Sequence, residues 1–214
     1  MQPQVKIPIF PLEVVLLPGM ILPLHIFEER YKIMIGECLA VYSEFGVVCC
    51  ESSEMKNKGC SARIERVLKR YDDGRMDIAT RGVRRFMIHS TSDDRPYLQA
   101  EVTYFDDAVE DETEEIDELI EEGVKLLGQL DSMAGKSEDY TPLFKLDHKA
   151  ISFWISNSTG FTVDDKQQCL EMTSTSGRIR KSVSSLKEIV ARMKVAQEVE
   201  RIIRGNGTLR KLKA

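Results

Sequence analysis

Two patterns of hydrophobic and polar positions divide the chain near residue 105. Before this point, apolar residues come in short runs bounded by turn residues, such as "FGVVCC" at 45–50, which is typical of strands. Beyond it, apolar residues recur at steps of three and four, which is typical of helices packed on one face. The pattern predicts an α+β protein, with a β domain over 1–108 and a helical bundle with a basic C-terminal tail over 109–214.

The apolar stretch 10–31 is broken by three prolines, whereas a membrane span needs about 20 continuous apolar residues. Proline removes a backbone donor and forces its predecessor extended, so the pieces are strand-sized. We expect strands over 13–17 (EVVLL) and 20–26 (MILPLHI), with Pro23 marking a strand edge or a bulge. A short helix follows, and its shared apolar face comprises Phe27, Tyr31, Met34 and Ile35.

The next strands are punctuated by glycine. "DDG" at 72–74 predicts a hairpin turn, because glycine tolerates positive φ, and Gly82 predicts a bulge in the second strand of that hairpin. Alternation over 96–105 predicts a last strand. Six or so short strands favour a small barrel or sandwich.

Four helices are expected in the second half. The first spans about 116–130, the second 143–156 and the third the short segment "TVDDKQQCLEM", with Asp164 near its N-terminus where a carboxylate suits the helix dipole. The last and longest runs over about 176–204 and is expected to end at Gly205-Asn206-Gly207.

Composition narrows the function classes. The net charge of −5 argues against general nucleic-acid binding, and no secretory signal is evident at the N-terminus. Five cysteines, odd in number and irregularly spaced, indicate reduced thiols in a cytoplasm rather than a disulfide framework or a zinc site.

Three motifs resemble parts of functional sites, but none meets the requirements of such a site. "AGKS" at 134–137 lacks the first glycine of a phosphate loop, because position 130 is leucine. The three histidines accompany no nucleophile turn. Arg84 and Arg85 face opposite sides of a strand, so with Arg81 they indicate a salt-bridged wall rather than an anion site. We therefore expect no catalytic residue, no cofactor and no metal.

Four blocks occur in order in the first 105 residues: "IPIFPLEVVLLPGMILPLHIFEERYKIMI", "GCSARI", "DDGRMDIATRGVRRFMI" and "PYLQAEV". Together they resemble the N-terminal domain of Lon, the ATP-dependent protease, and in particular the stand-alone Lon substrate-binding-domain proteins of bacteria. The resemblance implies a PUA-like β pseudobarrel over 1–108, followed by the helical bundle of 109–214. The ATPase and Ser-Lys peptidase modules of Lon are not carried over, so the chain is not expected to be an enzyme.

In Lon this domain is thought to recognise unfolded or tagged polypeptides. The resemblance therefore implies a non-catalytic, cytoplasmic module that binds unfolded or exposed hydrophobic polypeptide segments. A free strand edge flanked by apolar side chains could take up such a segment by β-augmentation. The candidate binding residues are Leu22, Leu24, Ile26, Phe27, Tyr31 and Met34, although each could instead belong to the core. Of these, Tyr31 and Met34 on the helix are favoured for a surface position, Met34 because its flexible thioether adapts to varied partners.

Other partners are left open at this point. They include a protease or chaperone and a second copy of the chain in a homodimer, whereas no membrane partner is expected. The alternative function is RNA binding by a PUA-like protein through its basic C-terminal helix, whose cations include Arg178, Arg180, Lys181, Arg201, Arg204, Arg210, Lys211 and Lys213. No aromatic residues are interleaved there as stacking platforms, which disfavours nucleic acid.

Overall fold

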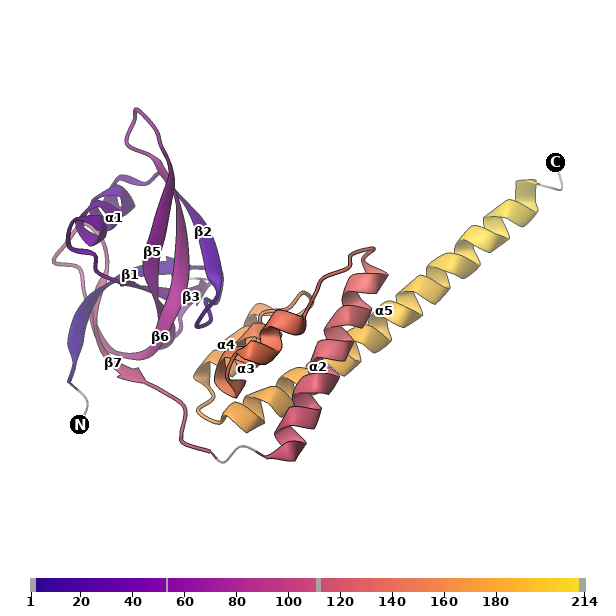
Figure 1. Ribbon diagram of the computed structural model, residues 1–214. Coiled ribbons are helices and arrows are strands. Elements are labelled where there is room, and N and C mark those ends of the chain that lie inside the picture. The colour runs from indigo at the N-terminus through magenta and orange to yellow at the C-terminus, as the bar shows by residue number, and fades with distance from the viewer. Residues whose placement is uncertain (1–2, 53, 111–112, 212–214) are drawn as a thin grey trace.

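The computed structural model describes residues 3–52, 54–110 and 113–211, with side chains up to residue 204. Its first half is a β structure with one helix, shown in indigo to magenta in Figure 1. The elements are β1 (Val5–Leu12), β2 (Ile21–Ile26), α1 (Glu29–Val41), β3 (Phe45–Glu51), β4 (Glu54–Met55), β5 (Lys58–Arg70), β6 (Met76–Ser92) and β7 (Gln99–Phe105).

Five of these strands close into a barrel. The order β1-β7-β6-β5-β3 is antiparallel throughout, and a parallel pairing between β1 and β3 joins its ends. Closure removes the strand edges within this ring. The short strand β4 pairs with β3, and β2 pairs with β6 outside the ring.

The strand expected at 13–17 is wrong, because this segment forms a loop between β1 and β2. Its apolar residues are nevertheless core residues: Leu16 is 3% and Leu17 0% exposed. The loop packs against β6 so closely that a Cβ on Gly82 would lie 2.3 Å from the carbonyl oxygen of Leu17. The register between β5 and β6 shifts beside Gly82, which confirms the predicted bulge. The hairpin turn at 72–74 is also confirmed, with Gly74 at φ +83°.

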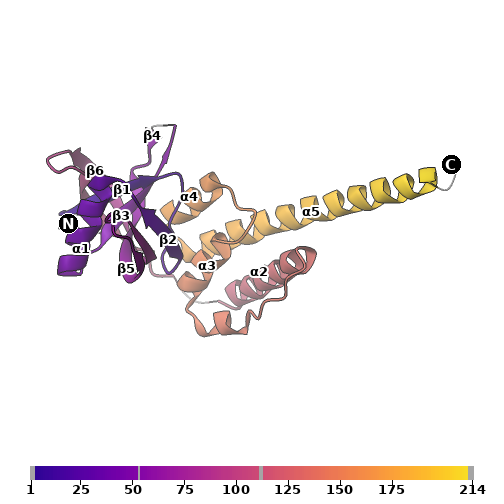
Figure 2. The same cartoon turned by 90° about the horizontal axis from the view of Figure 1, so that it is seen from above.

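The second half is helical and contains α2 (Glu114–Met133), the 3-10 helix η1 (Thr141–Lys145), α3 (His148–Ser156), α4 (Val163–Glu171) and α5 (Thr175–Lys211). Instead of one helix over 143–156, η1 and α3 are separate, because Asp147 caps α3 by accepting the Ala150 amide. α4 is capped by Thr162 with Asp165 in a capping box. α5 continues through Gly205-Asn206-Gly207, where an end was expected. Its last part extends beyond the bundle (Figures 1 and 2).

Two of these helices complete the barrel core. Phe153 of α3 and Leu170 of α4, each 1% exposed, belong to the same apolar cluster as Phe45 and Ile78 of the strands. Figures 1 and 2 both place α3 and α4 on the side of the bundle nearest the barrel. A separate core holds α2, α3 and α5 together, with Ile155 and Leu186 fully buried in it. The expected α+β class, a barrel followed by helices with a long last helix, is confirmed.

Candidate functional site

β2 is a strand with an open edge. It pairs antiparallel with β6 from Ile21–Arg81 to Ile26–Met76 and, in the part of the chain that is described, with no second strand. Pro23 sits in its middle, where the missing N–H is tolerated only if that side of the strand is unpaired. The predicted strand edge at Pro23 is therefore confirmed, and Figure 1 shows β2 at the flank of the barrel.

The backbone groups of successive β2 residues point alternately toward β6 and toward the open edge. The Gly82 amide donates to the Met20 carbonyl and the Thr80 hydroxyl to the Leu22 carbonyl, so residues 20, 22, 24 and 26 turn their backbone groups toward β6. The backbone groups of Ile21 and His25 then point away from the sheet. Hydrogen-bonding capacity for an extended chain is thus left at the outer edge.

The six candidate residues from the sequence divide between interior and surface. Ile26, Tyr31 and Met34 are buried, Leu22 and Leu24 are half-buried against the barrel core, and Phe27 is 60% exposed. The expectation that Tyr31 and Met34 face the surface is wrong. The Tyr31 ring stacks on Phe10 with ring centroids 4.0 Å apart, and Met34 is fully enclosed. The face that α1 turns inward therefore starts at Tyr31, and Phe27 lies before the helix.

The exposed surface beside β2 includes residues that the sequence did not single out for binding. Ile21 is 48% exposed, and the His25 ring stacks on Phe27 with centroids 5.9 Å apart. The Nδ1 of His25 lies 2.5 Å from Oδ1 of Asp77, whose Oδ2 accepts the Tyr71 hydroxyl at 2.8 Å. If Leu22, Leu24 and Ile26 point into the core, the period-two alternation of a strand places Ile21 and His25 on the exposed side. The sequence could therefore have indicated both as surface residues.

Hydrogen bonds shift the pKa values of two members of this cluster. Hydrogen bonds from His25 and then Tyr71 lower the pKa of Asp77, and the bond to Asp77 raises the pKa of Tyr71. At neutral pH Asp77 is therefore a carboxylate and Tyr71 a neutral donor. Lys69 and Arg75 lie over the Tyr71 ring, 4.4 Å and 4.9 Å from its centroid.

A second cluster lies where the barrel meets the helices. Arg85 of β6 and Arg178 of α5, 2% and 0% exposed, share the carboxylate of Asp107, which follows β7. Arg178 also lies over the ring of Phe153, 3.8 Å from its centroid, and donates to Ser152 at 2.8 Å. Burial alone would raise the pKa of Asp107, but Arg178, Thr175 and the charge of Arg85 lower it overall. Buried ion pairs among Arg85, Asp107 and Arg178 therefore link the barrel to the helices, and we call this cluster the joint.

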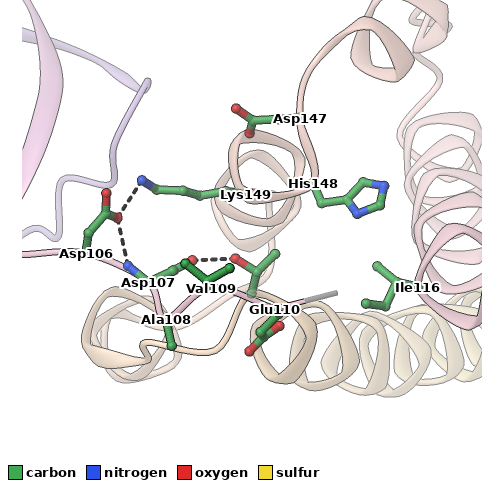
Figure 3. Close-up of a pocket in the computed structure, with 10 residues that line it drawn as sticks. Asp106, Asp107, Ala108, Val109, Glu110, Ile116, Asp147, His148 and Lys149 are labelled. Carbon is green, nitrogen blue, oxygen red and sulfur yellow. Dashed lines mark hydrogen bonds and ion pairs between the residues drawn. The ribbon is translucent and has the colours of Figure 1, made fainter. Parts of the chain in front are cut away.

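A pocket of about 240 Å³ opens beside the joint (Figure 3). Asp106 accepts from Lys149 at 2.5 Å and from the Asp107 amide at 2.8 Å, while Asp147 caps α3. His148 also lines the pocket and pairs with Asp117 at 2.9 Å. Among the described residues, the acidic groups of the pocket engage the joint, the start of α3 and, through Glu110 and the Ser176 amide, the start of α5.

The basic C-terminal residues whose side chains the structure describes do not form one surface. Arg178 is buried, Arg180 pairs with Glu115, and Arg201 and Arg204 pair with glutamates one turn earlier. The side chains of Arg210 and Lys211, and Lys213 as a whole, lie outside the described residues.

Metal and membrane features were searched over the same part of the chain. Across residues 3–52, 54–110 and 113–211, no group of three or more His, Cys, Asp or Glu side chains is placed to hold a metal ion. The helices described there include none with the length and apolar content that a bilayer crossing requires. All five cysteines are free thiols.

Comparison with known proteins gives a family. Residues 6–188 match the model of the ATP-dependent protease La (LON) substrate-binding domain. The chain belongs to this family. The Lon N-terminal domain protein from Xanthomonas campestris superposes with a TM-score of 0.67 at 21% identity, over 84% of this chain and 98% of that one. The N-terminal domain of Mycobacterium avium complex Lon protease gives 0.68 at 23%, over 86% and 98%.

Curated relatives of the Lon substrate-binding domain are much longer than this chain. The Lon protease of Parabacteroides distasonis is 32% identical over 117 residues, half of this chain and 14% of that protein. Lon protease 2 of Myxococcus xanthus is 23% identical over 95% of this chain and 26% of its own length. The chain thus spans about a quarter or less of these relatives.

Proposed function

We propose that this Lon substrate-binding domain is a non-catalytic module that binds unfolded or exposed hydrophobic polypeptide segments along the open edge of β2. The observation that carries the proposal is the coincidence of an unpaired strand edge with exposed apolar side chains, Ile21 and Phe27, in a member of this family. The Lon proteases to which the domain is similar act on polypeptides, which supports polypeptide as the ligand class.

The mechanism follows from strand chemistry. An extended segment that pairs with the outward backbone groups of Ile21 and His25 gains main-chain hydrogen bonds that do not depend on its sequence. Its side chains lie beside Ile21, Pro23 and Phe27, which contribute apolar contact. A folded protein has its backbone groups already paired, so it has none to pair with β2 and does not bind.

The test is a titration with reduced, carboxymethylated α-lactalbumin, which stays unfolded, against native α-lactalbumin. We expect saturable binding of the unfolded form only, weakened about tenfold by the double change Ile21→Ser with Phe27→Ala. Phe144→Ala is the matched control, because Phe144 is 51% exposed on η1, away from β2. Equal binding of both forms, or equal loss in the control, would contradict the proposal.

The cellular setting is part of the same proposal. We place the module in the cytoplasm, where it would deliver segments to a protease or chaperone partner. We also propose that the chain divides into a barrel domain of 1–108 and a helical bundle of 109–214, which share part of the barrel core. The delivery role would be tested independently of the β2 titration. A crosslinker placed next to Phe27 should recover a protease or chaperone partner.

A further inference from the structure

We infer that the projecting part of α5 docks against the same helix of a second copy of this chain, with the two helices antiparallel. The docking surface is a row of apolar side chains that α5 carries beyond the bundle, called here the α5 stripe. It consists of Val195, Val199, Ile202 and Ile203, which are 65%, 49%, 53% and 65% exposed. This interface is separate from β2 and does not depend on the proposed function.

The apolar side of α5 changes where the helix leaves the bundle. Leu186 and Val190 lie in the core shared with α2 and α3. At about 100° per residue, the side of α5 that carries them continues with Gln197 and Arg201, which are polar. Gln197 donates to the Met133 carbonyl of α2 at 3.2 Å. The α5 stripe lies on the opposite side of the helix, so the described part of the bundle leaves it exposed.

The spacing within the α5 stripe fits a helix as its partner. Val195, Val199 and Ile202 follow steps of four and three residues, which is the a/d pattern of a coiled coil. The side chains of an extended segment repeat at every second residue, so they do not match this pattern. β-branched side chains also keep a fixed rotamer in a helix, which suits them to pack as knobs into the holes of a like surface. A second α5 has this surface.

The charges that flank the α5 stripe are paired within the helix. Glu198 binds Arg201 at 2.8 Å, and Glu200 binds Arg204. These flanks therefore offer no surplus of either sign to a partner that binds through charge. A second copy brings the same internally paired flanks, so its approach sets no surplus of like charge against the first. The matching spacing and the paired flanks together favour a second copy as the occupant.

Charges that precede the α5 stripe decide the orientation. Glu188 and Arg192 are exposed on the same side of the helix, and the charge of Arg192 also reaches Asp165 of α4, whose pKa it helps to lower. In a parallel pair, Glu188 and Arg192 would each face the identical residue of the other copy. In an antiparallel pair centred on Val199, the two arginines are about 21 Å apart and the two glutamates about 33 Å. Both separations exceed the Debye length of about 8 Å at physiological salt, so the repulsion is screened.

The path of a second helix along α5 is open. α5 ends at Lys211, about twelve residues beyond Val199, so an antiparallel partner would extend back to about residue 187. Glu188 and Ala191 are exposed on this part of the path. Figures 1 and 2 show the last part of α5 projecting beyond α2. The stripe itself is only about 12 Å long, so we expect a weak dimer with a dissociation constant in the micromolar range.

Sedimentation equilibrium of the full chain, from about 1 µM to about 1 mM, tests the interface. We expect a monomer–dimer equilibrium that Val199→Glu weakens about tenfold or more, because the two new carboxylates would meet at the centre of the pair. Val199→Ile keeps the β-branched shape and should stay within about twofold of the original. Val41→Glu is the matched control, since Val41 is 73% exposed on α1 and the change of charge is the same. Circular dichroism confirms that each variant is folded.

Engineered cysteines test the orientation, in a Cys50→Ser background because the other four native thiols are buried. In the antiparallel pair, Val195 of one copy lies level with Ile203 of the other. A mixture of Val195→Cys and Ile203→Cys should therefore form an interchain disulfide. Neither variant should form one alone, because like positions are about 12 Å apart and a disulfide needs Cα atoms within about 7 Å. Disulfides in each variant alone, or none in the mixture, would overturn the antiparallel pair.

Other occupants give different results. A monomer at every concentration would overturn the inference, as would a dimer that Val199→Glu leaves intact. A dimer lost on Ile21→Ser with Phe27→Ala would place the second copy at the β2 edge instead. Binding of unfolded α-lactalbumin that is lost in Val199→Glu but kept in the β2 double variant would place polypeptide on the α5 stripe and overturn both proposals. Absence of that binding, with the dimer kept, would overturn only the proposed function.

Discussion

Asp107→Asn is the sharpest test of how the two halves of the protein are joined. The change keeps the size of the side chain and removes the one carboxylate that Arg85 and Arg178 share. Asp107 is 6% exposed, so water cannot replace the lost charge. Both guanidinium groups would remain buried at the boundary between barrel and helices.

The expected loss in the free energy of unfolding is about 3 kcal/mol. Removing one partner of a buried ion pair costs about 3–5 kcal/mol, because the remaining charge is left uncompensated. Here two cations are affected, but the carbonyls of Leu170 and Met172 still accept from them, Arg85 to Leu170 at 3.1 Å and Arg178 to Met172 at 3.0 Å. We therefore place the loss at the lower end of that range.

The assay is equilibrium unfolding in urea, followed by fluorescence and far-ultraviolet circular dichroism. Trp154, the single tryptophan, lies on α3 next to Phe153 and reports on the helices that contact the barrel. Asp106→Asn is the matched control: Asp106 also pairs with Arg85, at 3.6 Å, but it is 66% exposed, so we expect the change to alter stability by less than about 1 kcal/mol.

The dependence of the free energy of unfolding on pH, at acid pH, provides a second measurement. The pKa of Asp107 is lowered in the folded protein, so its contribution is present above the ordinary carboxyl pKa of about 4 and is lost as pH falls through the folded value. Asp107→Asn should flatten this part of the acid dependence. A loss below about 1 kcal/mol, or one no larger than that of Asp106→Asn, would refute the assignment of Asp107 as the joint.

Three further predictions concern local structure, all measured by thermal or urea unfolding. Gly82→Ala should destabilise by about 2 kcal/mol or more, because its Cβ would meet the Leu17 carbonyl at 2.3 Å, whereas Gly128→Ala, in open space on α2, should stabilise by about 0.5–1 kcal/mol. Equal effects of the two changes would contradict the close approach of the loop. Thr162→Ala should cost about 1 kcal/mol through loss of the α4 capping box, and Thr162→Ser should restore most of it. A fragment of residues 1–108 should unfold without a cooperative transition, because it lacks the α3 and α4 side chains of the barrel core and one arginine of the joint; a sharp transition would show that the barrel is autonomous.

Local patterns in the sequence predicted the elements whose stability is local. The hairpin at 72–74 follows from glycine at positive φ, and α2 follows from apolar residues in helical steps. Pro23 indicated an unpaired edge, because its missing donor has the same consequence in any fold. For these features the backbone chemistry of a few neighbouring residues is decisive.

The errors lie where distant segments compete for the same residues. "EVVLL" at 13–17 reads as a strand, yet its leucines are buried by packing onto β6 as a loop, since burial requires apolar side chains and not a particular backbone. Tyr31 was expected at the surface, but the Phe10 ring of β1 covers it.

What the sequence alone determined is therefore the kind of most elements and the division into a β half and a helical half. Tertiary structure decided which face of β2 is core, and it buried Arg85 and Arg178 on one aspartate. The physical reason is that periodicity records which residues avoid water, whereas the identity of the surface that covers them depends on segments far apart in the chain.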